Sequence, residues 1–144
     1  MAWNKPLPNI DHDNQPFWDG LRRHELLVFR CKHCGNSYWP AAYCRDCEPE
    51  ANFGNMEWVP ASGRGRVFAF NVHHYAFHPG FADDLPYVYA LVELEEGPNF
   101  GTNIIGCDPQ KVRVGMAVEV VYEDVEPDEG EPFTLAKFRP VVSR

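Results

Sequence analysis

Two pairs of cysteines constrain this chain more than any other feature of its sequence. Cys31 and Cys34 form the first C-x-x-C pair, Cys44 and Cys47 form the second, and nine residues separate the two. Two cysteines at this spacing fit on one tight turn with both sulfurs directed at one ion, and a second turn completes a tetrahedron at Zn–S distances of roughly 2.3 Å. Gly35 follows the first pair and suits the positive φ of such a turn. The spacing predicts a zinc ribbon.

Two disulfides are the alternative for these four cysteines. The N-terminus has neither an apolar h-region nor a small-residue cleavage site, so we expect a cytoplasmic protein with reduced thiols. Disulfides would also leave the fifth cysteine, Cys107, unpaired; we interpret it as a small buried hydrophobic residue. Because cysteine fills all four ligand positions, no position is open for water, and we expect the zinc to be structural.

The length and composition indicate one domain, or one domain with a small appendage. The chain has 144 residues, of which 44% are hydrophobic and 14% aromatic, which is enough for a buried core. Thirteen prolines and eleven glycines argue for many turns and against a helical bundle. No apolar run approaches the roughly 20 residues of a membrane span. We divide the chain into an extended arm (1–16), a helix with a zinc ribbon (17–56) and a β domain (57–144).

A short amphipathic helix is predicted between residues 15 and 27. Its apolar positions include Phe17, Trp18 and Leu21. Too little chain surrounds this helix to bury Phe17 and Trp18 completely. Two interpretations follow: the aromatic side chains pack on the zinc module, or they dock on a partner protein.

The β domain contains five predicted strands and no long helix. Residues 87–94 alternate between apolar and polar faces, as a sheet wrapped around a core requires. The other four strands are expected at 67–72, 102–106, 116–123 and 133–139. Five strands of this size fit a closed barrel of the OB type. An antiparallel sandwich is the alternative, but its seven strands do not fit easily. The predicted fold class is therefore mainly β.

The charge distribution bears on the possible partners. The net charge is −8, and residues 57–139 alone carry six basic and fourteen acidic residues, a difference of −8. Zinc ribbons and OB barrels both occur in single-stranded nucleic-acid-binding proteins, so this function is the alternative from another class. An acidic barrel would be repelled by a phosphate backbone, and we expect neither nucleic acid nor a membrane as partner.

Three histidines and two arginines are the remaining candidates for a site. His73, His74 and His78 invite an acid–base interpretation, but no nucleophile motif or orienting carboxylate accompanies them. We interpret them as polar residues of a long loop and predict no catalytic residue. The loop also carries the aromatic stretch 77–81, which we consider as a cover for a partner's substrate pocket. Arg64 and Arg66 lie in a Gly-Arg-Gly-Arg stretch and are either ligands of a phosphate group or solvated charges.

The order of these features resembles a known family, over residues 16–140. The stretches that carry the resemblance are Phe-Trp-Asp-Gly-Leu (17–21), the two cysteine pairs, 62–67, 86–94, 106–109, 114–118 and 138–140. In this family a rubredoxin-like zinc ribbon precedes an OB-fold, and it was long catalogued as a domain of unknown function. The resemblance implies a partner of the thiolase superfamily that acts on acyl-CoA.

The stretch His-Pro-Gly-Phe-Ala-Asp-Asp-Leu-Pro (78–86) is similar to one branch of the family, which works with steroid side-chain aldolases. In that branch a thiolase-fold subunit performs retro-aldol chemistry, and the ribbon–OB subunit stabilises it and shapes its entrance. Other branches assist acetyl-CoA acetyltransferases and condensing enzymes. The resemblance implies a non-catalytic accessory subunit of an aldolase or thiolase complex in lipid metabolism, with Phe17, Trp18 and Leu21 as partner-binding residues. It also implies coenzyme A as the phosphate-bearing ligand to expect at Arg64 and Arg66, with solvated charges as the alternative.

Overall fold

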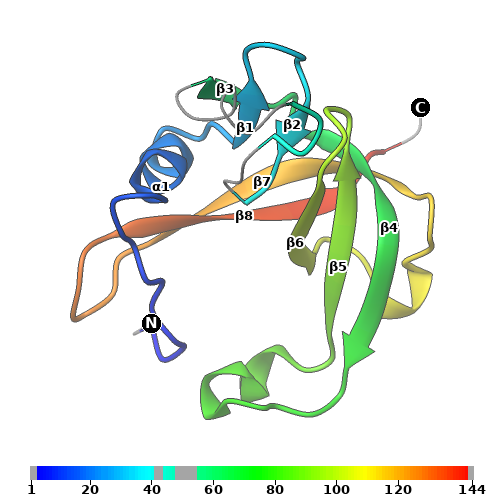
Figure 1. Cartoon of the computed structure of the whole chain (residues 1–144). Helices are drawn as coiled ribbons and strands as arrows, with labels where there is room; N and C mark the ends of the chain where they lie inside the picture. Colours follow the sequence, from blue (N-terminus) through cyan, green and yellow to red (C-terminus); the bar gives the residue numbers. More distant parts are fainter. Residues whose placement is uncertain (1–2, 41–43, 48–54, 143–144) are drawn as a thin grey trace.

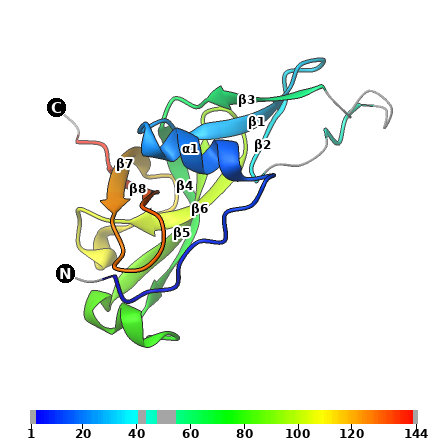
Figure 2. The same ribbon diagram turned by 90° about the vertical axis from the view of Figure 1, so that its left-hand side faces the viewer.

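The computed structural model describes residues 3–40, 44–47 and 55–142. It contains one short α-helix, a small three-stranded sheet and a closed five-stranded barrel (Figure 1). The helix and the small sheet lie together at one end of the barrel, as Figure 2 shows from a second direction. This architecture confirms the predicted fold class, a zinc ribbon followed by an OB-type barrel.

The small sheet has the strand order β2-β1-β3, and both pairings are antiparallel. Its strands are β1 (Leu27–Cys31), β2 (Ser37–Tyr38) and β3 (Met56–Pro60). All five residues of β1 pair with β3, which satisfies backbone groups that the two-residue β2 cannot reach. Strand pairing therefore makes residues 56–60 part of the small sheet. The sequence 48–56 is linker-like, and its residues 48–54 lie outside the described part of the chain.

The barrel closes because its first strand pairs with two others. The order around the barrel is β4-β5-β6-β8-β7, and β4 also pairs with β7. The strands are β4 (Arg64–His73), β5 (Tyr87–Leu94), β6 (Asn99–Ile104), β7 (Ala117–Val125) and β8 (Phe133–Pro140). Strands β6 and β8 run parallel, as at the closure point of an OB barrel.

Strict alternation of side chains builds the barrel core. Every second residue of β5, beginning with Val88, is buried, and β6 follows the same pattern. Between the parallel strands β6 and β8, a side chain supplements the backbone pairing: the Thr102 hydroxyl donates a hydrogen bond of 2.8 Å to the carbonyl oxygen of Ala136. This bond explains a buried polar residue at an inward position.

Helix α1 (Gln15–Arg22) joins the ribbon to the barrel. Its side chains Phe17 and Leu21 belong to the same buried cluster as Val28 of β1 and Val67 of β4. Gly20 lets the helix approach the following strand, because a Cβ there would meet the Leu27 side chain at 2.7 Å. One continuous core therefore runs through both modules.

Two 3₁₀ helices, which the sequence analysis did not predict, interrupt the loops of the barrel. They are η1 (Pro79–Asp84) and η2 (Pro109–Lys111). His78 caps the first, since its Nδ1 atom accepts a hydrogen bond of 3.0 Å from the backbone N–H of Gly80. His73 stacks on Tyr87, with the ring centroids 4.8 Å apart. Both histidines thus have structural contacts.

The N-terminal arm runs along the barrel in the extended form that its sequence predicts. Lys5 forms an ion pair of 3.1 Å with Asp84 in η1, and the Trp3 ring contacts Phe133 edge-on at 5.4 Å between centroids. Figure 2 shows the arm, in dark blue, passing from α1 towards η1. These contacts place the arm against η1 and the first residue of β8.

Candidate functional site

The four predicted zinc ligands converge at the tip of the small sheet. Their sulfur atoms all lie within 4.8 Å of one another. Cys31 Sγ lies 3.7 Å from Cys47 Sγ, and Cys34 Sγ lies 3.4 Å from Cys44 Sγ. A tetrahedron with Zn–S bonds of roughly 2.3 Å has edges of about 3.8 Å, so the four sulfurs have the spacing that one zinc ion requires.

Local backbone geometry brings the first pair into position. The N–H of Gly35 donates to the carbonyl oxygen of Cys31 at 2.8 Å, and Gly35 has a φ of +81°, which confirms the expected turn. Residues 41–43, which precede the second pair, lie outside the described part of the chain. Cys31 and Cys44 are fully buried, whereas Cys34 is exposed, so the site faces solvent on one side only.

Tyr38 supports the site from the second strand of the ribbon. Its hydroxyl donates to Cys44 Sγ at 3.5 Å and accepts from the backbone N–H of Arg45 at 3.0 Å. The Arg45 guanidinium lies 4.8 Å from the centroid of the Tyr38 ring. Sequence analysis did not identify Tyr38 as part of the site, although its place before the second knuckle was a usable signal.

Hydrogen bonds favour the metal-binding thiolate form of two of the four cysteines. Donation from the Tyr38 hydroxyl lowers the pKa of Cys44 to about 6. The backbone N–H of Cys34 lowers the pKa of Cys31. The pKa of Cys47 is raised, chiefly because a hydrogen bond with the Cys44 sulfur stabilises its protonated form. Zinc would displace such remaining protons. The donor set fits a closed, structural zinc site.

The three residues predicted to bind a partner lie at the junction of the modules. Leu21 is 1% exposed and Phe17 is 8% exposed. The Phe17 ring packs among those of Trp18, Trp39, Trp58 and Phe100, with centroid distances from 5.7 to 6.3 Å. The structure thus gives Phe17 and Leu21 a packing role, the first of the two interpretations. Trp18 is half-buried, and its role in binding a partner stays a prediction.

The two candidate arginines lie on the first barrel strand beside acidic neighbours. Glu119 is opposite Arg64 on β7, and Glu93 is opposite Arg66 on β5. The cleft they share is lined by these four residues and Glu95, which gives two positive and three negative charges, a net charge of −1. Arg66 also donates to the carbonyl oxygen of Gly115 at 3.0 Å. The lining of this cleft therefore adds no further cationic group to support the prediction that Arg64 and Arg66 bind coenzyme A.

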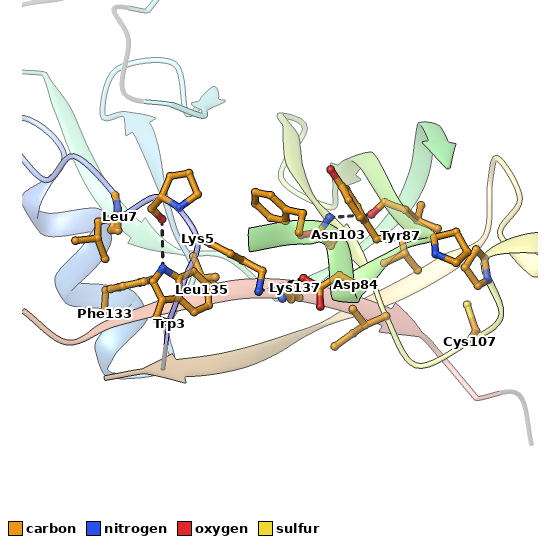
Figure 3. A pocket seen from close by; sticks show the side chains of 18 of the residues that line it. Trp3, Lys5, Leu7, Asp84, Tyr87, Asn103, Cys107, Phe133, Leu135 and Lys137 are labelled. Carbon is orange, nitrogen blue, oxygen red and sulfur yellow. Dashed lines mark hydrogen bonds and ion pairs between the residues drawn. The ribbon is translucent and has the colours of Figure 1, made fainter. Parts of the chain in front are cut away.

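Sequence reasoning missed a cavity between the N-terminal arm and the barrel. It has a volume of about 650 Å³ and is lined mainly by apolar side chains (Figure 3). Cys107 is part of its wall, and burial raises the pKa of this thiol, in line with its prediction as a small hydrophobic residue. The cavity has no local sequence signal, because its walls come from segments about 130 residues apart, such as Trp3 and Phe133.

Family models match both modules of the chain. The model described as "ChsH2, rubredoxin-like zinc ribbon domain" matches residues 18–52, and "ChsH2, C-terminal OB-fold domain" matches residues 58–123. A "DUF35 domain-containing scaffold protein" of Methanocaldococcus jannaschii is 36% identical over 123 residues, which are 83% of this chain and 84% of that protein. The chain belongs to the DUF35 family. The DUF35 assignment confirms the resemblance seen in the sequence and, with the four converging sulfurs, supports structural zinc.

Two further comparisons extend the DUF35 assignment. A "Probable enoyl-CoA hydratase alpha subunit" of Thermomonospora curvata is 35% identical over 141 residues, which are 96% of this chain but 40% of that protein. A solved structure described as "Ltp2-ChsH2(DUF35) aldolase" matches with a TM-score of 0.79 and 34% identity, and the match covers 94% of this chain and 100% of that chain. Relatives of this DUF35 chain thus include a scaffold protein and chains named for enzymes that act on CoA esters or as aldolases. Among the described residues, no helix is long and apolar enough to cross a membrane.

Proposed function

We propose that this chain is a non-catalytic accessory subunit that binds a thiolase-superfamily partner and supports cleavage of a carbon–carbon bond in an acyl-CoA. One observation carries the proposal: the full-length match to the DUF35 chain described as part of an aldolase, at 34% identity and a TM-score of 0.79. A match of this length includes both modules, the ribbon and the barrel.

The chemistry of the described residues supports a role without catalysis. The four clustered cysteines form a complete ligand set with no position left for a substrate. His73 and His78 are engaged in stacking and capping, and His24 Nε2 lies 3.0 Å from the carboxylate of Asp124, at hydrogen-bond distance. In the described part of the chain, no nucleophile lies beside a histidine base in the way covalent catalysis requires. The partner would supply the chemistry.

The aromatic loop before η1 is the surface we assign to the partner. Phe77 is 80% exposed and Tyr75 is 69% exposed, and their rings pack edge-on with centroids 5.2 Å apart. Exposed aromatic pairs of this kind are typical anchors of protein interfaces. Phe17 and Leu21 are too deeply buried to dock on a partner, and we therefore assign docking to this loop. It adjoins the stretch 77–81, which the sequence analysis considers as a cover for the partner's substrate pocket.

Coenzyme A contact at Arg64 and Arg66 is a separate part of the proposal. Two guanidinium groups on one strand can hold a phosphate, but Glu93 and Glu119 directly opposite compete for them. Replacing both arginines by glutamine should raise the KM of the complex for acyl-CoA without changing the affinity of the two subunits. An unchanged KM would remove these residues from the substrate site.

Co-expression with the thiolase-like protein encoded nearest to this chain tests the main proposal. We expect the two to co-purify and the partner to lose solubility or acyl-CoA cleavage activity when expressed alone. Phe77→Ala should weaken the complex by about tenfold or more, the loss that an interface hot spot gives. Phe68→Ala is the matched control, because Phe68 is also exposed, at 53%, but lies on β4 outside this loop.

Two outcomes would contradict the proposal. If the partner is fully active alone and never associates with this chain, the accessory role is wrong, and a salt-dependent gel shift with single-stranded nucleic acid becomes the next test. If the complex forms but Phe77→Ala and Phe68→Ala behave alike, the docking surface lies elsewhere.

A further inference from the structure

The cavity beside the N-terminal arm has the size and lining of a small-molecule site. Its volume of about 650 Å³ lies in the middle of the range for such sites, roughly 300 to 1,000 Å³. Figure 3 shows Trp3 and Leu7 of the arm on one side and Tyr87 and Asn103 of the barrel on the other. Ile104 and Leu135 add apolar surface from β6 and β8.

Three of the residues that line this cavity are charged, and all of its lining residues belong to the described part of the chain. They are Lys5, Lys137 and Asp84, and Glu123, which lies outside the lining, pairs with Lys137. Figure 3 shows Lys5, Lys137 and Asp84 between Trp3 and Tyr87. Each ammonium group is paired with one carboxylate, and the two ammonium groups are the charged donors that this lining offers to an anionic ligand.

Both lysine side chains are largely covered, and their ammonium groups retain donor capacity. The side chains of Lys5 and Lys137 are 19% and 23% exposed. Lys5 pairs with Asp84 at 3.1 Å, and Lys137 pairs with Glu123 at 2.6 Å. Each ammonium has three donors, so one carboxylate partner leaves donors for a ligand. Reduced exposure to water strengthens the interaction of such donors with an anion.

Tertiary contacts hold the arm as the wall of the cavity. The carbonyl oxygen of Asn4 packs so closely on Gly80 that a Cβ there would meet it at 2.2 Å. The Lys5 ammonium lies over two rings, 4.9 Å from the centroid of Trp3 and 5.7 Å from that of Phe81. These contacts place one of the two ammonium groups at a defined position in the cavity wall.

We propose that this cavity binds one amphipathic carboxylate. The apolar body of the ligand lies against Trp3, Ile104 and Leu135, and its carboxylate accepts hydrogen bonds from Lys137 and Lys5. A cationic ligand would be repelled by the two ammonium groups, and a neutral apolar ligand would cover their remaining donors without offering an acceptor. The site belongs to this chain alone, so its test does not depend on the partner proposed above.

Isothermal titration of the full zinc-loaded chain with decanoate tests the proposal. We expect saturable binding with one decanoate per chain. Decyltrimethylammonium, which has the same alkyl chain and the opposite charge, should bind at least tenfold more weakly, because it cannot accept the charged hydrogen bonds. Both probes are used below the concentrations at which they form micelles.

Two pairs of variants locate the bound ligand. Lys137→Gln should weaken decanoate binding by about tenfold, whereas Lys32→Gln removes the same charge from the ribbon and should have no effect. Leu135→Trp fills the cavity and should abolish binding, whereas Leu91→Trp makes the same change on β5 outside the cavity lining. Circular dichroism shows whether each variant is folded, and if Leu135→Trp is not, Trp3→Ala replaces it with an expected loss of at least tenfold.

Several results would overturn the proposal. These are the absence of saturable decanoate binding, equal affinity for the cationic probe, and equal effects of Lys137→Gln and Lys32→Gln. Stoichiometry above one decanoate per chain with no response to Lys137→Gln would show general adsorption to exposed apolar residues instead of a site.

Discussion

Replacing Phe17 by alanine should destabilise the whole chain, although the sequence alone allowed this residue to be an exposed docking group. The ring is 8% exposed and touches aromatic rings from the helix, the ribbon and the barrel. A buried aromatic side chain removes about 150 to 250 Å² from water, which at about 25 cal/mol per Å² corresponds to about 4 to 6 kcal/mol as an upper bound. Core phenylalanine-to-alanine changes typically cost about 3 to 5 kcal/mol, and we expect this range.

Urea unfolding of the zinc-loaded protein, followed by far-ultraviolet circular dichroism, measures this loss. Phe77→Ala is the matched control, because Phe77 is 80% exposed and its removal should change the free energy of unfolding by less than about 0.5 kcal/mol. Since small domains have a total stability of about 5 to 15 kcal/mol, Phe17→Ala should lower the unfolding midpoint strongly. A loss below about 1 kcal/mol, or equal losses for both variants, would refute the shared core and restore Phe17 as a docking candidate.

Three further perturbations test other parts of the structure. Cys44→Ser should release the single zinc ion, measured by a chromogenic chelator, whereas Cys107→Ser should retain it; zinc in both or in neither would contradict the assigned ligands. The Thr134 hydroxyl, 2.6 Å away, lowers the pKa of Asp124. The stabilisation from Asp124 is therefore complete above its unfolded pKa and is lost as the pH falls through the lower folded pKa. In urea titrations the difference between wild type and Asp124→Asn should shrink below about pH 4, and growth of the difference there would be inconsistent with this sign. Gly80→Ala should displace the arm and speed hydrogen exchange of its amides; unchanged exchange would show that the arm is not packed as described.

Local sequence patterns predicted most of the secondary structure. The strand predicted at 87–94 coincides with β5, because a strand with one face in the core alternates at period two wherever it lies. The prediction at 133–139 differs from β8 by one residue. The zinc ribbon was predictable for a similar reason, since the C-x-x-C spacing and Gly35 are the local requirements of a metal-binding turn.

Contacts between distant segments were not predictable in this way. Strand β3 was not predicted, and its five residues do not show which sheet they join; that depends on pairing with β1, about 30 residues earlier. The sequence also did not show the net charge of the cleft at Arg64 and Arg66, since Glu93 and Glu119 come from other strands. Pairing of this kind follows from the register of the whole sheet.

The sequence by itself determined the zinc ribbon, the five barrel strands and the family, because each depends on residue types at short, regular spacings. Only the tertiary structure decided which aromatic residues are buried and which face solvent: Phe17 is 8% exposed and Phe77 is 80% exposed. It alone created the cavity that Lys5 and Lys137 share. The physical reason is that burial and local charge are properties of all the segments that surround a side chain, and most of these segments are remote in the sequence.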